Sequence, residues 1–297
     1  MKDQATQLSR RAFIGTTAAA AALAMTPNNL FAGGKPDSNF KGVQIGAITY
    51  SFRSMPGSAD DLLKYLVTCG ISSIELMGGP VEQFAGIPKE NVREWRASVS
   101  MDKFKELRKI YNDAGVNIHI VKFGDIGPKV SEEEIHYYFQ AAKALGAKGI
   151  TTEISNDKAK FLGPIADEHK LMIGFHNHTK ISADAYEKPF SYGKYLAMNL
   201  DVGHYVAGTN ESPLPLIEKY AEQNRILSLH FKDRKVNNGP NMPFGLGDTP
   251  VALILHQMQR NKYDFPADIE LEYDIPEGSD AVAEVKKCVE FCENALS

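Results

Sequence analysis

Eight short apolar runs, alternating with segments of helical periodicity, constrain the fold of this chain more than any other feature. Each run has the length of a buried β-strand, and several are apolar on both faces, as in a parallel sheet that helices cover on each side. The runs span residues 43–50, 73–77, 117–123, 149–154, 171–176, 195–201, 226–231 and 268–273. This alternation predicts an α/β protein with one (β/α)8 TIM barrel.

Helix start and stop signals support the same fold. Ser58 begins a helix that ends at Gly70. Ser131 with Glu134 forms a capping box for a helix that ends at Gly146. Further helices are expected over 100–115, 213–223, 249–262 and 279–296. A doubly wound sheet would alternate in the same way, but no Gly-x-Gly-x-x-Gly motif follows the first run. The barrel is therefore the predicted architecture.

The N-terminus has the pattern of a targeting segment. Arg10 and Arg11 precede an uncharged, alanine-rich stretch over 16–25, which resembles a twin-arginine export signal. That stretch of about 10 residues is too short to cross a hydrocarbon core of about 30 Å. We therefore expect a signal peptide over 1–32, a short linker over 33–42, a barrel over 43–297, no stable membrane anchor, and a periplasmic or otherwise exported protein.

Composition excludes two broad classes. The chain has 33 Lys and Arg against 37 Asp and Glu, a net charge of −4, so it lacks the basic surplus with which nucleic-acid-binding proteins neutralise phosphates. Its three cysteines cannot build a disulfide framework. We expect no nucleic-acid partner.

Five successive runs end in carboxylates or imidazoles, at the rim where a barrel of this type keeps its chemistry. These residues are Glu153, then His176 and His178, then Asp201 and His204, then His230, and finally Glu270 and Glu272. A cluster of buried charges is stable only if a cation or reciprocal pairing compensates it. Mixed oxygen and nitrogen ligands suit Mn²⁺, Mg²⁺, Co²⁺ or Zn²⁺.

Glu153, Asp201, His230 and Glu272 are the predicted ligands of one divalent metal ion. Glu270 and Glu272 share one face of their strand, so alternation leaves the choice between them open. Glu272 is preferred because it lies nearer the rim.

The order of these motifs on successive strands resembles the sugar phosphate isomerase/epimerase family of xylose isomerase-like barrels, which includes ketose 3-epimerases, hydroxypyruvate isomerases and inosose dehydratases. The resemblance covers roughly residues 43–296. It implies that Glu153 and Glu272 bind the metal and exchange protons with the substrate, that Asp201 and His230 complete the ligand set, and that His204 contacts substrate oxygens. The segment 271–274 also resembles a Val-Glu-Gln-Asp pattern of exported relatives, which favours Glu272.

The chain departs from the ketose epimerases at one substrate-binding position. Those enzymes carry an arginine six residues after the histidine of the seventh strand, where this chain has Val236. Arg234 is the nearest substitute, and the substrate is therefore expected to differ from a simple ketohexose. His178 is the preferred substrate contact of the His-x-His pair because it lies nearer the rim than His176.

These residues predict a metal-dependent isomerase or epimerase of a carbohydrate, which removes a proton next to a carbonyl through a metal-stabilised enediolate. A lyase or dehydratase acting on a keto-sugar, 3-keto-glycoside or inosose would use the same residues. An AP endonuclease-like phosphodiesterase would need more histidines for its three zinc ions, and a catalytically inactive sugar-binding barrel would tolerate loss of Glu153. Relatives are often dimers or tetramers, so a homo-oligomer is an open expectation.

Overall fold

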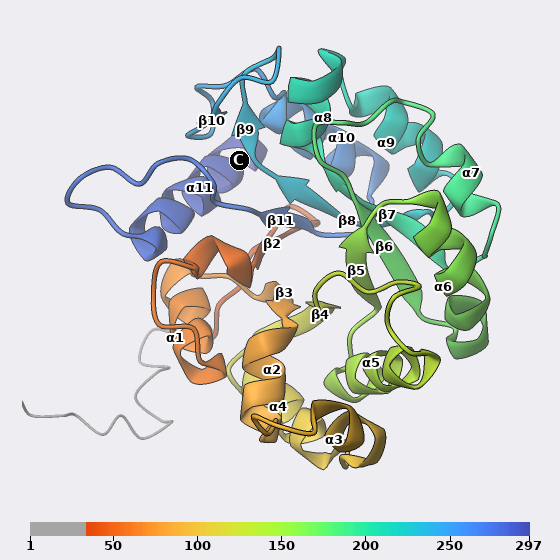
Figure 1. The fold of residues 1–297 in the computed structure, drawn as a ribbon. Helices are drawn as coiled ribbons and strands as arrows, with labels where there is room; N and C mark the ends of the chain where they lie inside the picture. The colour runs from red at the N-terminus through yellow and green to blue at the C-terminus, as the bar shows by residue number, and fades with distance from the viewer. Residues whose placement is uncertain (1–33) are drawn as a thin grey trace, which may run out of the picture.

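The computed structural model describes residues 34–297, which form a closed barrel of eight parallel strands surrounded by helices (Figure 1). Around the barrel the strands follow the order β2, β3, β4, β5, β6, β7, β8 and β11, and pairing between β2 and β3 closes the ring. The predicted (β/α)8 architecture is confirmed. The predicted signal peptide over 1–32 lies outside the described residues.

The barrel strands coincide closely with the eight predicted runs. Their bounds are β2 Val43–Ile48, β3 Ser73–Met77, β4 Asn117–Lys122, β5 Gly149–Glu153, β6 Met172–His176, β7 Leu196–Asp201, β8 Ile226–Phe231 and β11 Ala267–Ile269. The last strand is shorter than predicted, although the Glu270 amide still donates to the Phe231 carbonyl at 2.9 Å. The chain that carries Glu270 therefore remains attached to β8 beyond the end of β11.

Capping side chains define the start of two predicted helices. Ser58 caps α1 (Ala59–Cys69) by accepting from the Asp61 amide, and Ser131 caps α5 (Glu132–Leu145) by accepting from the Glu134 amide. The other predicted helices are α4 Asp102–Asp113, α9 Leu214–Ala221, α10 Val251–Asn261 and α11 Ala281–Leu296. Within residues 34–297, no helix has the length and apolar character needed to cross a membrane.

Several helices were not predicted. They are α2 Gly78–Ala85, α3 Val92–Ser98, α6 Asn156–His169, α7 Glu187–Phe190 and α8 Val202–Thr209. Ser155 caps the start of α6 by accepting from the Lys158 amide, but Pro164 lies inside the helix and Lys170, rather than a glycine, adopts the left-handed conformation at its end. Tertiary packing compensates for these unfavourable residues, since Leu162 and Ala166 of α6 are fully buried.

The segment before the first barrel strand is more than a linker. Within the span predicted as linker, β1 (Asn39–Phe40) pairs antiparallel with β2. The Ser38 hydroxyl is buried and donates to the Ile45 carbonyl at 2.6 Å. This hairpin covers the amino-terminal end of the barrel next to β2. Two further short strands, β9 (Asp233–Arg234) and β10 (Asn241–Met242), form a hairpin at the other end.

The interior of the barrel changes from apolar to polar along its axis. Near the amino-terminal end, Leu227 fills the centre together with Ile120 and Ala197. Gly149 and Gly174 make room for it, because a Cβ at either position would lie within 3 Å of the Leu227 side chain. The residues above this plug on the same strands are polar, and they support the site described below.

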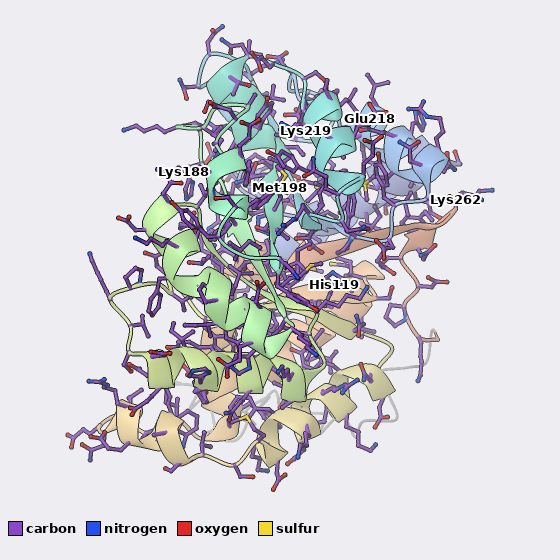
Figure 2. The ribbon with its side chains drawn as sticks, turned by 90° about the vertical axis from the view of Figure 1, so that its right-hand side faces the viewer. His119, Lys188, Met198, Glu218, Lys219 and Lys262 are labelled. Carbon is purple, nitrogen blue, oxygen red and sulfur yellow. The ribbon has the colours of Figure 1, made fainter. Side chains whose placement is uncertain are left out.

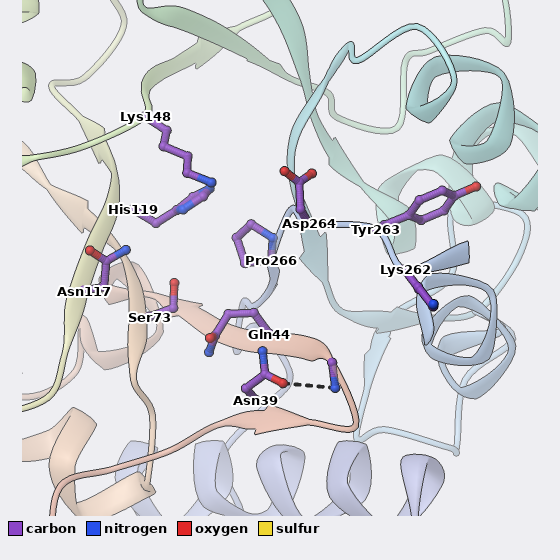
Figure 3. A pocket seen from close by; sticks show the side chains of 11 residues that line it. Asn39, Gln44, Ser73, Asn117, His119, Lys148, Lys262, Tyr263, Asp264 and Pro266 are labelled. Atoms are coloured by element: carbon purple, nitrogen blue, oxygen red, sulfur yellow. Dashed lines mark hydrogen bonds between the residues drawn. The ribbon is translucent and has the colours of Figure 1, made fainter. Parts of the chain in front are cut away.

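A cavity of about 380 Å³ lies at the amino-terminal end of the barrel, and Figure 3 shows its lining. Lys148 and His119 lie on one side of it, and Asp264, Tyr263 and Lys262 lie on another. His119 sits in the middle of the molecule in Figure 2. Its Nε2 lies 3.2 Å from the Leu227 carbonyl oxygen, so the neutral ring donates a hydrogen bond there.

Replacing His119 with Gln is expected to remove a step in the acid sensitivity of the fold. Burial lowers the pKa of His119 from 6.5 to about 4. Between these pH values the unfolded chain binds a proton that the folded chain does not, so the free energy of unfolding decreases as the pH falls from about 6.5 to about 4. The full shift corresponds to about 3 kcal/mol. Urea unfolding of both proteins across this pH range measures it.

Glutamine retains a donor for the Leu227 carbonyl, so the two proteins should differ little in stability at neutral pH. Equal slopes of unfolding free energy against pH for both proteins would contradict a buried neutral imidazole at His119.

Candidate active site and metal centre

A pocket of about 200 Å³ lies at the carboxyl ends of the barrel strands, the end where (β/α)8 enzymes place their chemistry. It is smaller than the cavity at the amino-terminal end, but it collects most of the ionisable side chains that end the strands. Those lining it are Lys122, Glu153, His176, His178, His204, Lys232, Glu270 and Glu272. We identify this pocket as the candidate active site because of that composition rather than its size.

Four buried side chains at the floor of the pocket form a potential metal centre. His176 ends β6, Asp201 ends β7, His230 belongs to β8, and Glu270 follows β11. One ligand atom from each lies within 4.8 Å of the others. Two imidazoles and two carboxylates are a mixed nitrogen and oxygen donor set that suits a divalent transition metal.

Glu75 orients His230 from below. His230 is fully buried, with Nε2 2.8 Å from Glu75 Oε2 and Nδ1 3.1 Å from Glu270 Oε2. Burial alone would lower the pKa of His230, but these two carboxylates outweigh it and hold that pKa well above its usual range. If Nε2 keeps its proton for Glu75, Nδ1 is the nitrogen that faces Glu270 and the other potential ligands. This is the carboxylate–histidine arrangement that supports many metal sites.

Asn199 orients His176 in a comparable way. Its Nδ2 donates to Glu75 Oε2 at 3.1 Å and to the Ser228 hydroxyl at 2.5 Å, so its Oδ1 accepts from His176 Nδ1 at 3.0 Å. An amide with both donors engaged in this way leaves only its oxygen for the imidazole. His176 therefore carries its proton on Nδ1 and keeps the lone pair on Nε2, the atom available to a ligand.

Asp201 presents one oxygen to the pocket without a well-formed partner. Its Oδ1 accepts from the His204 amide at 2.7 Å and caps α8. Its Oδ2 lies 3.0 Å from Lys232 Nζ, but the angles are too poor for a hydrogen bond. Burial raises the pKa of Asp201 to about 6, against the opposing effect of Lys232. A carboxylate oxygen in this situation fits a cation ligand.

Lys232 places a positive charge among the carboxylates. Its Nζ lies 3.0 Å from Asp201, 2.9 Å from Glu270 and 2.5 Å from Glu272. Burial alone would lower the pKa of Lys232, but these three carboxylates raise it above its usual range. The ammonium therefore stays charged.

Opposite charges are crowded at the pocket. The carboxylates of Glu75, Glu153, Asp201, Glu270 and Glu272 lie within it or directly beneath it, together with the ammonium groups of Lys122 and Lys232 and the imidazole of His230. The donor set and the Asp201 oxygen that lacks a well-formed hydrogen bond fit a divalent cation.

Glu153 forms a separate cluster on the opposite wall. Its Oε1 accepts from Lys122 Nζ at 2.9 Å, and its Oε2 lies 3.0 Å from His178 Nε2. Burial would raise the pKa of Glu153, but His178, His176 and Lys122 outweigh it and hold that pKa far below its usual range. The Glu153 carboxylate in turn raises the pKa of His178. Glu153 is therefore an ionised carboxylate with two potential proton or hydrogen-bond donors.

His204 lies between the basic side chains of Lys232 and Arg234. Its Nε2 lies 3.1 Å from Lys232 Nζ, and its Nδ1 lies 2.7 Å from Arg234 Nη1. Both partners can only donate, and a neutral imidazole has a single accepting nitrogen, so His204 accepts from only one of them at a time. Burial and Lys232 lower the pKa of His204 to about 2. The Arg234 guanidinium is further held by the Gly239 carbonyl at 2.6 Å.

The structure brings only part of the predicted ligand set together. Asp201 and His230 lie in the potential metal centre, whereas Glu153 and Glu272 line the pocket outside it. His176 and Glu270 complete the cluster instead. The physical reason is the distance of each residue from the barrel rim. Asp268 pairs with His230 in the sheet, so the Glu270 side chain, two residues later, reaches the cluster. Glu272 lies two residues further along the chain and nearer solvent. Alternation along a strand shows the face but not the depth.

The predicted substrate contacts all lie at the rim. His178 is exposed and bonded to Glu153, and His204 and Arg234 contact each other. Lys122 and Asn199 were not predicted. Lys122 ends β4 in the same way as the charged residues on later strands, a signal that could have identified it. Asn199 lies within an apolar run, and only its register opposite His176 reveals its role.

Similarity to solved structures supports the fold. The probable 3-DHS dehydratase AsbF of Bacillus anthracis, involved in petrobactin synthesis, matches with a TM-score of 0.64 at 14% identity over 84% of this chain and 99% of its own. A sugar phosphate isomerase/epimerase of Parabacteroides distasonis matches with a TM-score of 0.58 at 19% identity over 84% and 93%.

The 3-keto-D-glucoside 4-epimerase YcjR of E. coli matches with a TM-score of 0.61 at 12% identity, over 85% of this chain and 99% of its own. No family model and no curated protein matches the sequence. The structural neighbours are sugar phosphate isomerase/epimerase and xylose isomerase-like barrels, and at these identities the likeness establishes the fold.

Replacing Glu75 with Gln is expected to weaken metal binding without removing a ligand. The neutral amide retains the shape of the side chain but no longer holds the Nε2 proton of His230 with a full charge. Such supporting changes typically cost roughly 10- to 100-fold in metal affinity. Calorimetric titration of the variant and the wild type with Mn²⁺ or Zn²⁺ measures the change in affinity. Unaltered affinity would show that Glu75 does not support the metal centre.

Proposed function

We propose that this protein is a metal-dependent isomerase or epimerase of a sugar or sugar derivative, acting by proton transfer at a carbon next to a carbonyl. The observation that carries the proposal is the placement of two carboxylates on opposite walls of one pocket. Glu153 ends β5 and Glu272 follows β11, and these strands are four positions apart in a ring of eight. A substrate between them presents one face to each carboxylate.

Glu153 is suited to accept the proton. Lys122 and His178 keep it ionised and hold its two oxygens in place. A hydroxyl of the substrate that draws His178 away from Glu153 removes the positive neighbour of Oε2, and the basicity of that oxygen then rises. His178 is exposed enough to turn toward such a hydroxyl, since its side chain is 64% accessible.

Glu272 is suited to handle the proton on the other face. It lies beside Lys232, which in turn contacts His204. Return of the proton to the same carbon from this side inverts the centre, and return to the neighbouring carbon gives an isomer. His204 and Arg234, at the same side of the rim, are the proposed contacts for the substrate's oxygens.

His176, Asp201, His230 and Glu270 are the residues that would hold a divalent cation. When bound, such a cation would polarise the carbonyl and favour loss of the neighbouring proton. The chain itself supplies the orientation: Asn199 and Glu75 fix which imidazole nitrogens face the cluster. Glu153 and Glu272 then remain free for proton transfer.

A lyase or dehydratase is the second candidate, and Lys232 favours it. Elimination needs stabilisation of the departing hydroxyl, and Lys232 is a charged hydrogen-bond donor beside Glu272 and His204. Among the structural neighbours, one is a probable dehydratase of 3-DHS and another epimerises a 3-keto-glucoside. A keto-sugar or keto-glycoside is therefore the substrate class to test first.

The compartment and assembly are also proposals. Arg10, Arg11 and the apolar stretch over 16–25 support export by the twin-arginine pathway. An exported enzyme of this kind would act on unphosphorylated carbohydrate. We also propose a homo-oligomer, because relatives in the family that the sequence resembles are often dimers or tetramers.

Replacing Glu153 with Gln is expected to abolish exchange of substrate hydrogen with solvent while leaving the fold intact. General acid–base residues contribute roughly 10²- to 10⁴-fold to rate. The test follows deuterium incorporation from D₂O into a panel of ketoses and 3-keto-glycosides, with added Mn²⁺. Glu133→Gln, at an exposed position of α5, is the matched control and should exchange at the wild-type rate.

The products separate the two candidates. A stereoisomer or positional isomer supports the first, and loss of water supports the second. Exchange that survives in Glu153→Gln, with circular dichroism unchanged, would refute the role of Glu153.

A further inference from the structure

Two histidines outside the barrel pocket lie in unusually close contact on the outer wall. His136 belongs to α5 and His169 to α6, helices that run next to each other around the barrel (Figure 1). His136 Nδ1 lies 2.6 Å from His169 Nε2. The carboxylate of Glu168 approaches both, so that one ligand atom from each of the three residues lies within 4.8 Å of the others.

Packing fixes the orientation of this cluster. The His169 ring stacks on Phe139, with 4.5 Å between ring centroids and an angle of 15° between planes. His136 Nε2 lies 3.8 Å from Glu132, one turn earlier on the same helix. The stacked ring and the neighbouring carboxylate therefore hold the two imidazoles in place on adjacent helices.

The hydrogen bonds show that a single proton lies between the two rings. Lys143 Nζ lies 3.3 Å from His169 Nδ1, and an ammonium can only donate, so Nδ1 accepts. Nε2 then carries the hydrogen and donates it to His136 Nδ1. A metal ion that replaced this one proton would bind both nitrogens, with Glu168 as a third ligand.

We propose that His136, His169 and Glu168 form a second divalent-metal site, suited to Zn²⁺ and shared by α5 and α6. Imidazole nitrogens with a carboxylate are a common Zn²⁺ ligand set, and tetrahedral geometry would separate the two nitrogens by about 3.3 Å. The rings therefore need to part only slightly. The site shares no residue with the barrel pocket, and its occupation would join two neighbouring helices and stabilise the folded chain.

The test counts Zn²⁺ bound per full-length chain at neutral pH, with Zn²⁺ alone as the probe. His136→Ala and His169→Ala should each lose the same single equivalent, together with part of the rise in Tm that Zn²⁺ produces. His230→Ala probes the barrel site separately and should keep this equivalent. His256→Ala, which removes an exposed histidine of α10, should match the wild type.

Lys143→Gln tests the proton arrangement itself. When His169 binds through Nε2, its Nδ1 must carry the hydrogen, and the lysine ammonium opposes that state. The Gln amide oxygen can accept the hydrogen, so this variant should bind Zn²⁺ more tightly than the wild type. The proposal is overturned if both histidine variants retain the wild-type stoichiometry and Tm response, or if Lys143→Gln binds more weakly.

Discussion

The ion pair between Glu75 and His230 is the contact on which the candidate site depends. Both side chains are fully buried and 2.8 Å apart. Glu75 also accepts from Thr151 at 2.6 Å and from Asn199 at 3.1 Å. A buried charge is stable only when its remaining positions are satisfied, and breaking such a pair typically costs 3–5 kcal/mol. One carboxylate below the pocket thus organises groups from three other strands.

This arrangement connects the barrel interior to the chemistry at its rim. Leu227 plugs the amino-terminal half, and Gly149 and Gly174 leave it space. Above the plug, Glu75 and Asn199 set the protonated nitrogens of two histidines. The groups that contact a substrate or cation therefore rest on side chains that have no freedom to rearrange, which is the basis of preorganisation in enzyme sites.

The electrostatics of the pocket follow from a crowded set of carboxylates that Lys122, Lys232 and His230 partly offset. Lys232 offsets part of the charge of Asp201, Glu270 and Glu272. Asp268, beneath the site, has no hydrogen-bond partner for either oxygen among residues 34–297, and burial raises its pKa to about 8. It is therefore largely neutral at pH 7, which limits the negative charge that the barrel must hold.

The barrel itself could be predicted from the sequence, because eight apolar runs with helical segments between them have few other ways to bury their surfaces. Helices α1 and α5 were predictable for a local reason, because Ser58 and Ser131 accept hydrogen bonds from free amides in the first turn. Helix α6 was missed although Ser155 caps its start, because Pro164 interrupts its helical pattern and no glycine marks its end.

The sequence by itself also determined which rim would collect carboxylates and imidazoles, since strand ends can be read from the order of residues. Only the tertiary structure decided which of them meet. Glu270 rather than Glu272 lies beside His230 because strand register sets depth. The role of Asn199 depends on its neighbour across the sheet, and the contact between His136 and His169 depends on how two helices pack. These relations join residues distant in the chain, and no local pattern encodes them.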